Sequence, residues 1–163
     1  MISQQVLFTP EECDKLISYG KDFRTVGIYK QPETTITMID EHQELYEMLN
    51  SKFVSNTIKK FPLYFKLLRY HEGVYFNLHK DSDGKDDRRK TIIVQLSDPE
   101  DYEGGVLILK GLNESIEADR TRGNVIIYPA TTFHQVSKVT SGIRYVLVTW
   151  LESQHLNLTK TII

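Results

Sequence analysis

Hydrophobic and polar positions divide the chain into a helical first part and a strand-rich second part. The segment Thr9–Glu12 combines an N-cap residue, a proline at the first helical position and acidic residues, so we expect a helix from there to about Gly20. Short strands are expected at 26–29 and 34–38. Between residues 40 and 60, apolar residues at roughly helical spacing predict a longer helix with one buried stripe: Leu45, Met48, Leu49, Phe53 and Ile58.

From about Leu63 the pattern changes to short β-branched and aromatic runs separated by Gly, Asp, Asn and Pro. It predicts strands at 63–70, 74–81, 90–97, 105–110, 115–119, 124–128, 133–139 and 143–151. Short strands without intervening helices are typical of an antiparallel jelly roll. We therefore expect a single α+β, mainly β domain over 1–163. Residues 1–62 would give helical support packed on the major sheet, and 63–152 a cupin-like, double-stranded β-helix core.

Composition narrows the function classes. A chain of 163 residues can build one domain with a genuine core. A net charge of -2 and a pI near 6.2 argue against nucleic acid or a membrane surface as partners. The single Cys13, together with the lack of a signal-like N-terminus or a long apolar segment, predicts a soluble protein in a reducing, cytoplasmic compartment.

The strand expected at 74–81 carries the first candidate site. Alternation places Asn77, His79 and Asp81 on one face, and Val74, Phe76 and Leu78 on the other. We expect the apolar face to pack against the helices and the polar face to point into the barrel. A His-x-Asp pair and a second histidine, His134, can together grip one metal ion, as in non-haem Fe(II) oxygenases. The alternative is a hydrogen-bonded surface pair.

Arg144 is the second candidate. It shares a strand face with Val146, Val148 and Trp150, so its guanidinium needs an anionic partner if that face is buried. The planar fork of an arginine can hold a ligand carboxylate through two parallel hydrogen bonds. The other reading is an internal salt bridge to a protein carboxylate.

These residues, in this order, resemble the Fe(II)- and 2-oxoglutarate-dependent dioxygenases. The resemblance is to the prolyl 4-hydroxylase-like branch, and within it to the PKHD-type hydroxylases. It rests on Leu68-Arg69-Tyr70, the His79-x-Asp81 pair, the stretches 96–105 and 123–130, and His134 and Arg144.

The resemblance implies that iron is held by His79, Asp81 and His134. It implies further that Arg144 binds the distal carboxylate of 2-oxoglutarate, with Tyr70 beside this cosubstrate. Gln95 stands where some prolyl hydroxylases have a tyrosine, and it either donates a hydrogen bond to that carboxylate or only lines the barrel.

The family reaction converts 2-oxoglutarate and O2 to succinate and CO2 while a substrate C–H bond is hydroxylated. The implied cofactors are Fe(II), 2-oxoglutarate and O2, with ascorbate as an accessory. A prolyl or other peptidyl residue is the expected substrate, and a small molecule is the other candidate.

Two other functions compete with this one. A non-catalytic jelly-roll module would bind a metal or ligand without turnover. A nucleic-acid demethylase of the AlkB type would be expected to have a second arginine six residues after Arg144, where this chain has Trp150. We interpret Trp150 and Phe133 as core residues, and residues 81–90 as either a solvated turn or a substrate lid.

Overall fold

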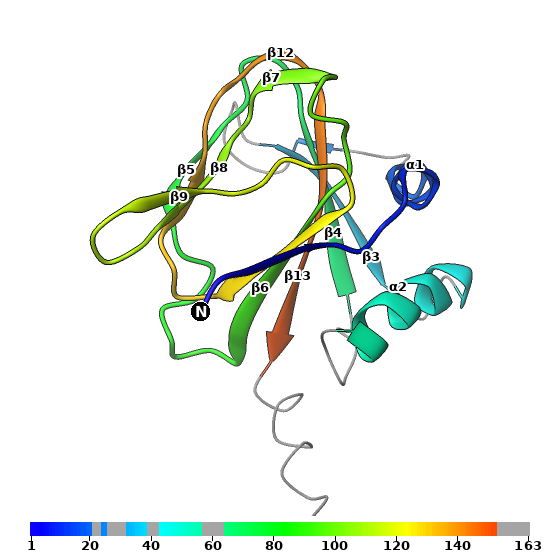
Figure 1. Cartoon of the computed structure of the whole chain (residues 1–163), viewed down its shortest axis with the longest axis horizontal. Helices are drawn as coiled ribbons and strands as arrows, with labels where there is room; N and C mark the ends of the chain where they lie inside the picture. The colour runs from blue at the N-terminus through cyan, green and yellow to red at the C-terminus, as the bar shows by residue number, and fades with distance from the viewer. Residues whose placement is uncertain (21–23, 26–31, 39–42, 57–63, 153–163) are drawn as a thin grey trace, which may run out of the picture.

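Two antiparallel β-sheets pack face to face, and two helices cover the outer face of the larger sheet (Figure 1). The arrangement is that of a computed structural model, which describes residues 1–20, 24–25, 32–38, 43–56 and 64–152. The helices are α1 (Pro10–Ser18) and α2 (Gln43–Asn56).

The sheets are antiparallel throughout the described residues. The larger sheet has the order β1 (Ser3–Val6), β10 (Asn124–Pro129), β6 (Arg88–Gln95), β13 (Arg144–Glu152), β4 (Tyr64–Tyr70), β3 (Glu33–Met38) and β2 (Arg24–Thr25). The smaller sheet has the order β5 (Phe76–His79), β11 (His134–Val136), β8 (Leu107–Lys110) and β9 (Ser115–Glu117). A separate pair joins β12 (Val139–Gly142) to β7 (Tyr102–Gly104). This mainly β architecture confirms the expected jelly roll.

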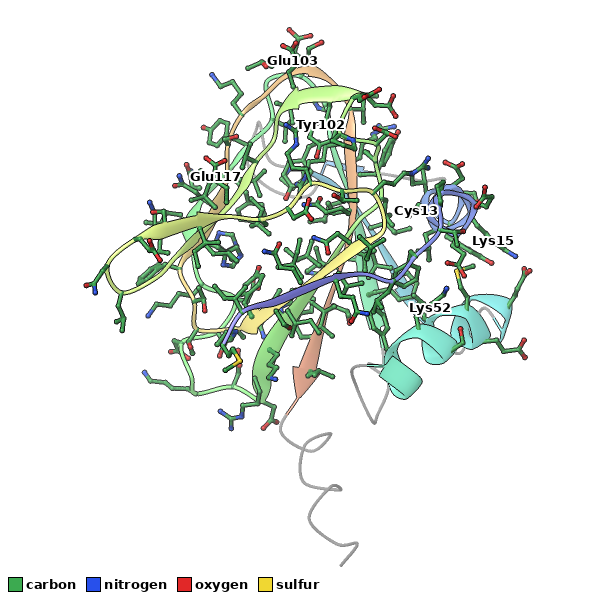
Figure 2. The ribbon with its side chains drawn as sticks, in the orientation of Figure 1. Cys13, Lys15, Lys52, Tyr102, Glu103 and Glu117 are labelled. Carbon is green, nitrogen blue, oxygen red and sulfur yellow. The ribbon has the colours of Figure 1, made fainter. Side chains whose placement is uncertain are left out.

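Helix α1 begins where the sequence predicts. The Thr9 hydroxyl accepts a hydrogen bond from the Glu12 amide, and the Glu12 carboxylate accepts one from the Thr9 amide, which closes a capping box. The two helices are joined by ion pairs, Lys15 with Glu44 and Lys52 with Glu12, whose lysines are labelled in Figure 2. The charged sides of the helices therefore face each other, and their apolar sides turn to the sheet.

Apolar residues form one core on each face of the larger sheet. Between the sheet and the helices, Cys13, Leu16, Leu49 and Phe53 pack against residues of β4, β6, β10 and β13. Between the two sheets, a second core includes Tyr128, Val146 and Trp150 of the larger sheet and Leu109 of the smaller one. Because β10 and β13 are covered on both faces, their sequences are mostly apolar, whereas β6 is apolar only at Ile92, Ile93 and Val94.

The predicted strands differ from the observed ones in several places, and the short strands β2 and β7 lie outside the predicted ranges. The segment expected as one strand at 133–139 is interrupted, because β11 ends at Val136 and the chain then pairs with β7 as β12. Strand β1 was not predicted, since all four of its side chains are exposed and show no alternation. The strand expected at 26–29 and the stripe residue Ile58 lie outside the described residues.

The expected packing of β5 on the helices is wrong. This strand belongs to the smaller sheet, on the other side of the larger sheet from α1 and α2 (Figure 1). Its register with β11 slips, because His79 faces His134 while Phe76 faces Val136. Such a bulge breaks the two-residue alternation. Phe76 consequently stacks on the ring of His79, and Leu78 is 49% exposed.

None of the described helices is long and apolar enough to span a lipid bilayer.

Gly123 provides a test of how the N-terminal strand is fastened to the sheet. It has a φ of +81°, and a Cβ atom there would lie 2.0 Å from the backbone oxygen of Phe8. Gly73 has a similar φ of +85° with open space around it. We expect Gly73→Ala to lose about 1–2 kcal/mol of unfolding free energy from backbone strain alone. Gly123→Ala should lose clearly more, because the backbone must also move.

Denaturant unfolding of both variants measures this difference. Equal losses would contradict the predicted collision with Phe8.

Candidate metal centre

A cavity of about 340 Å³ lies between the two sheets. Its described lining comes from both of them: Pro32, Lys66, Leu68, Tyr70, Phe76, His79, Lys80, Asp81, Arg88, Ile93, Leu107, Tyr128, His134, Val136, Val148 and Trp150. The apolar and aromatic part of this lining is the inner core of the jelly roll. The predicted metal ligands therefore face a space large enough for a small ligand.

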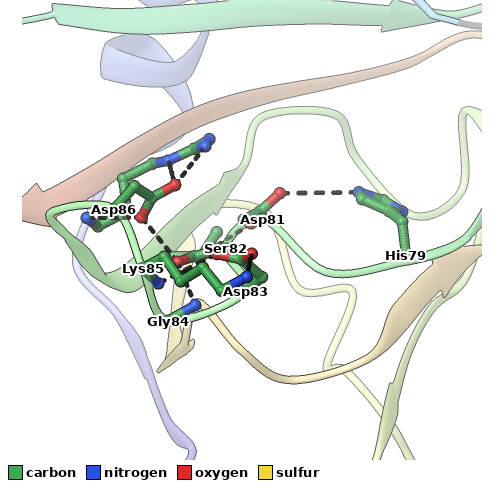
Figure 3. Close-up of polar contacts among 9 residues, drawn as sticks. His79, Asp81, Ser82, Asp83, Gly84, Lys85 and Asp86 are labelled. Carbon is green, nitrogen blue, oxygen red and sulfur yellow. Dashed lines mark hydrogen bonds and ion pairs between the residues drawn. The ribbon is translucent and has the colours of Figure 1, made fainter.

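The structure brings His79, Asp81 and His134 together. His79 on β5 and His134 on β11 are direct partners across the two strands, and Asp81 follows β5 by two residues. One ligand atom from each of the three lies within 4.8 Å of the others. Figure 3 shows the carboxylate of Asp81 directed at the His79 ring. Two imidazoles and a carboxylate on one side of a cation leave its remaining positions open to small ligands.

Each imidazole is oriented by a backbone carbonyl near it in the chain. His79 Nδ1 lies 2.7 Å from the Asn77 oxygen, and His134 Nδ1 lies 3.0 Å from the Thr132 oxygen. A carbonyl only accepts, so each Nδ1 carries the proton and donates it. The Nε2 atoms then keep their lone pairs, which a metal ion requires.

The carboxylate of Asp81 lies between the two Nε2 atoms. Its distances to them are 3.7 Å for His79 and 3.8 Å for His134. Oδ1 is the oxygen that faces His79, while Oδ2 faces His134 and also accepts a hydrogen bond of 2.5 Å from the Thr91 hydroxyl on β6. Thr91 is fully buried, so this contact fixes the carboxylate from within the larger sheet.

The pKa values of the three groups shift in different directions. Burial raises the pKa of Asp81, but hydrogen bonds and the charges of the histidines outweigh it, and the net pKa lies below the usual value. Burial lowers the pKa of His134. Burial also opposes protonation of His79, yet the hydrogen bond to Asp81 raises its pKa overall. Acid therefore competes with a cation mainly at His79.

Arg144 lies deeper in the fold, with 1% of its surface exposed. Its Nη2 donates a hydrogen bond of 3.0 Å to the Gln95 side-chain oxygen, while Nε and Nη1 are buried with no hydrogen-bond partner. Among the ion pairs of the described residues none includes Arg144, so the alternative of an internal salt bridge finds no support. Two unpartnered guanidinium nitrogens fit an anion that the protein itself does not supply.

Tyr70 connects Arg144 to the cavity. The Arg144 guanidinium carbon lies 5.0 Å from the centre of the Tyr70 ring, and Tyr70 is part of the cavity lining, which Arg144 and Gln95 are not. Burial raises the pKa of Tyr70 to about 12, which keeps its hydroxyl protonated as a donor. Gln95 points inward as predicted, but its oxygen faces Arg144 and its amide donates to the Asp119 carbonyl at 3.5 Å.

Residues 82–88, between the cavity-lining residues Asp81 and Arg88, are joined by side-chain hydrogen bonds (Figure 3). Ser82 donates to Asp86, which in turn accepts from Arg88 through Nε at 3.1 Å and Nη2 at 2.8 Å. The amides of Asp81 and Ser82 both donate to the Ala130 carbonyl. These contacts hold residues 81–88 in a defined conformation, and the choice between a solvated turn and a substrate lid for 81–90 stays a prediction.

The structure changes the assignment of Phe133 and gives Trp150 and Thr91 an additional role. Phe133 is not a core residue, because 47% of it is exposed at the turn before β11, where Lys80 lies over its ring. Trp150 is buried as expected and also lines the cavity. The role of Thr91 was missed, although its inward position on the Thr91-x-Ile93-x-Gln95 face signalled it.

Thr91 makes the positioning of the carboxylate testable. Thr91→Val removes the hydroxyl at almost constant volume, so Asp81 should lose its fixed orientation. We expect affinity for Fe(II), measured anaerobically by calorimetry, to fall by about 10–100-fold. Thr91→Ser keeps the donor and should retain most of the affinity. A valine variant that binds Fe(II) as tightly as the wild type would show that Thr91 only fills space.

Similar proteins agree with the resemblance found in the sequence. Residues 65–152 match the model of the 2OG-Fe(II) oxygenase superfamily. A PKHD-type hydroxylase of Prochlorococcus marinus strain MIT 9313 is 37% identical over 119 residues, covering 64% of this chain and 53% of that protein. The one from strain NATL2A is 28% identical over 151 residues, covering 84% and 67%. The chain spans between 38% and 53% of the length of several curated relatives that it matches.

Solved structures lead to the same family. A viral collagen prolyl hydroxylase from Paramecium Bursaria Chlorella virus-1, in a 2-oxoglutarate complex, is 26% identical with a TM-score of 0.63, covering 91% of this chain and 93% of that one. A 2OG-Fe(II) family oxidoreductase from Burkholderia pseudomallei has a TM-score of 0.71 at 14% identity, covers 91% and 82%, and supports the fold alone. With the family match extending over more than half of the sequence, this chain belongs to the 2OG-Fe(II) oxygenase superfamily.

Proposed function

We propose that the protein is an Fe(II)- and 2-oxoglutarate-dependent hydroxylase that oxidises a prolyl or other peptidyl C–H bond. The observation that carries the proposal is the pairing of a two-imidazole, one-carboxylate cluster with a buried arginine that lacks an anionic partner. The PKHD-type and prolyl hydroxylase names of the relatives support the peptidyl substrate by similarity.

In this proposal His79, Asp81 and His134 hold Fe(II) through two Nε2 atoms and one carboxylate. When bound, Fe(II) with 2-oxoglutarate and O2 supplies the oxidation of the substrate, and 2-oxoglutarate leaves as succinate and CO2. The backbone carbonyls of Asn77 and Thr132 keep the imidazoles in the tautomer that can bind a metal. The apolar lining excludes water from the reacting centre.

Arg144 would hold the distal carboxylate of 2-oxoglutarate. Its Nε and Nη1 are the two donors still available, and Gln95 fixes the guanidinium through Nη2. The protonated hydroxyl of Tyr70 adds a neutral donor beside them. An anion buried among these donors is stabilised by charge and hydrogen bonds together. Ascorbate as an accessory cofactor and a cytoplasmic location remain predictions.

Succinate formation tests the metal site. Asp81→Ala or His134→Ala removes a proposed iron ligand, so Fe(II)-dependent release of succinate from 2-oxoglutarate should fall to background. Circular dichroism of each variant verifies folding. Anaerobic addition of Fe(II) and 2-oxoglutarate to the wild type should give a weak visible charge-transfer band. A wild-type protein that gives neither the band nor succinate would be a non-catalytic jelly-roll module.

Arg144 provides a second, separate test. Arg144→Met keeps much of the length of the side chain and removes its hydrogen-bond donors. The KM for 2-oxoglutarate should therefore rise about 10–100-fold, which corresponds to the loss of one or two hydrogen bonds to a charged group. Arg144→Lys keeps the charge but lacks the planar fork, so its KM for 2-oxoglutarate should lie between those of the wild type and the methionine variant. An unchanged KM in the methionine variant would refute the proposed role of Arg144.

A further inference from the structure

The cations that line the cavity suggest what kind of substrate enters it. Three basic residues belong to the described lining, Lys66, Lys80 and Arg88, and we call them the cationic rim. Asp81 is the one acidic residue among the described residues that line the same space. Its carboxylate already faces both histidines and accepts from Thr91, so it does not neutralise the rim. The rim stands out against a chain whose net charge is -2.

Burial separates the rim from the inner lining. Ile93, Leu107 and Tyr128 are at most 6% exposed. Lys80 is exposed, and Lys66 and Arg88 are half-buried. The apolar residues therefore form the inner wall of the cavity, and the cations lie where it meets solvent.

The rim residues come from both sheets and rest on aromatic rings. Lys66 on β4 has its Nζ 5.3 Å from the centre of the Trp150 ring, and the Arg88 guanidinium carbon lies 5.6 Å from the same ring. Lys80, which follows β5, has its Nζ 4.3 Å from the centre of the Phe133 ring. Contact with aromatic faces limits where these long side chains can go. An anion at the opening is then met by positive charge from two sides.

We propose that the cavity selects substrates that carry a carboxylate close to the oxidised carbon, and that the normal substrate is a peptide with an acidic side chain beside the oxidised residue. This inference rests on the proposed function and deepens it. The ring of Trp150 offers an apolar surface for the reacting part, while Lys66 and Lys80 take the flanking charge. Arg88 contributes less charge, because Asp86 is paired with it.

The chain contains a built-in reporter for this site. Trp150 is its single tryptophan and lies directly beneath two of the rim cations, so its fluorescence responds to a ligand at the opening. The probes are blocked Glu-Pro-Glu, Gln-Pro-Gln and Lys-Pro-Lys tripeptides. N-acetylglutamate is added to separate a free acid from an acidic peptide. The full chain is titrated anaerobically with Fe(II) and 2-oxoglutarate present.

We expect the acidic peptide to bind at least about tenfold more tightly than the neutral one, and the basic peptide to bind more weakly still. Lys66→Glu with Lys80→Glu should reverse this order. Lys110→Glu with Lys138→Glu makes an equal change of charge at two exposed residues outside the cavity lining, and it should leave the order unchanged. The KM for 2-oxoglutarate should change less than the peptide affinity in the Lys66→Glu, Lys80→Glu variant, because Arg144 lies elsewhere.

Tighter binding of N-acetylglutamate than of any peptide would identify a small acid as the substrate and overturn the peptide assignment.

Equal binding of the three peptides, no binding of any, or an unchanged order in the Lys66→Glu, Lys80→Glu variant would overturn the inference. Each of these results leaves the proposed function intact if the charge-transfer band and succinate release persist. Their loss in the wild type would instead remove the proposed function itself.

Discussion

The constraint on which this structure depends is the burial of a carboxylate between two apolar sheets. Asp81 cannot remain ionised there without partners, and those that the fold gives it include the imidazoles of His79 and His134 and the hydroxyl of Thr91. These partners come from β5, β11 and β6, so both sheets must be in register for the cluster to exist. The candidate metal centre therefore forms only when the two sheets of the jelly roll have paired correctly.

Arg144 is the corresponding case of a buried positive charge. A fully buried guanidinium that has no ion pair with any described carboxylate is costly in the ligand-free protein, and the proposed binding of an anion would relieve that cost. Gln95, a neutral partner, leaves the positive charge uncompensated where an Asp or Glu would have cancelled it. In the proposed function, the free energy that this buried charge costs the ligand-free protein would reappear as affinity for the carboxylate of 2-oxoglutarate.

The sequence predicted those features of the fold and the site that depend on residues close together in the chain. The capping residues fixed the start of α1, and the order of His79, Asp81, His134 and Arg144 pointed to the site. Alternation failed at β5 because the bulge opposite His134 and Val136 depends on pairing that no single strand encodes. Phe133 was misjudged because it belongs to a turn, and the role of Thr91 required knowing that β6 passes beside Asp81. How β5, β6 and β11 come together is a tertiary property, and the sequence pattern of one segment does not contain it.

Strand β1 has a consequence for how the protein can be handled. It covers the outer edge of β10, pairing from Ser3 with Ile127 to Val6 with Asn124, and its Gln4 side chain accepts from the Asp119 amide. Without it, the backbone groups of β10 would face solvent as an open template for other strands. Trimming the first six residues would thus promote self-association while leaving His79, Asp81 and His134 untouched, and any affinity tag is better attached away from this edge.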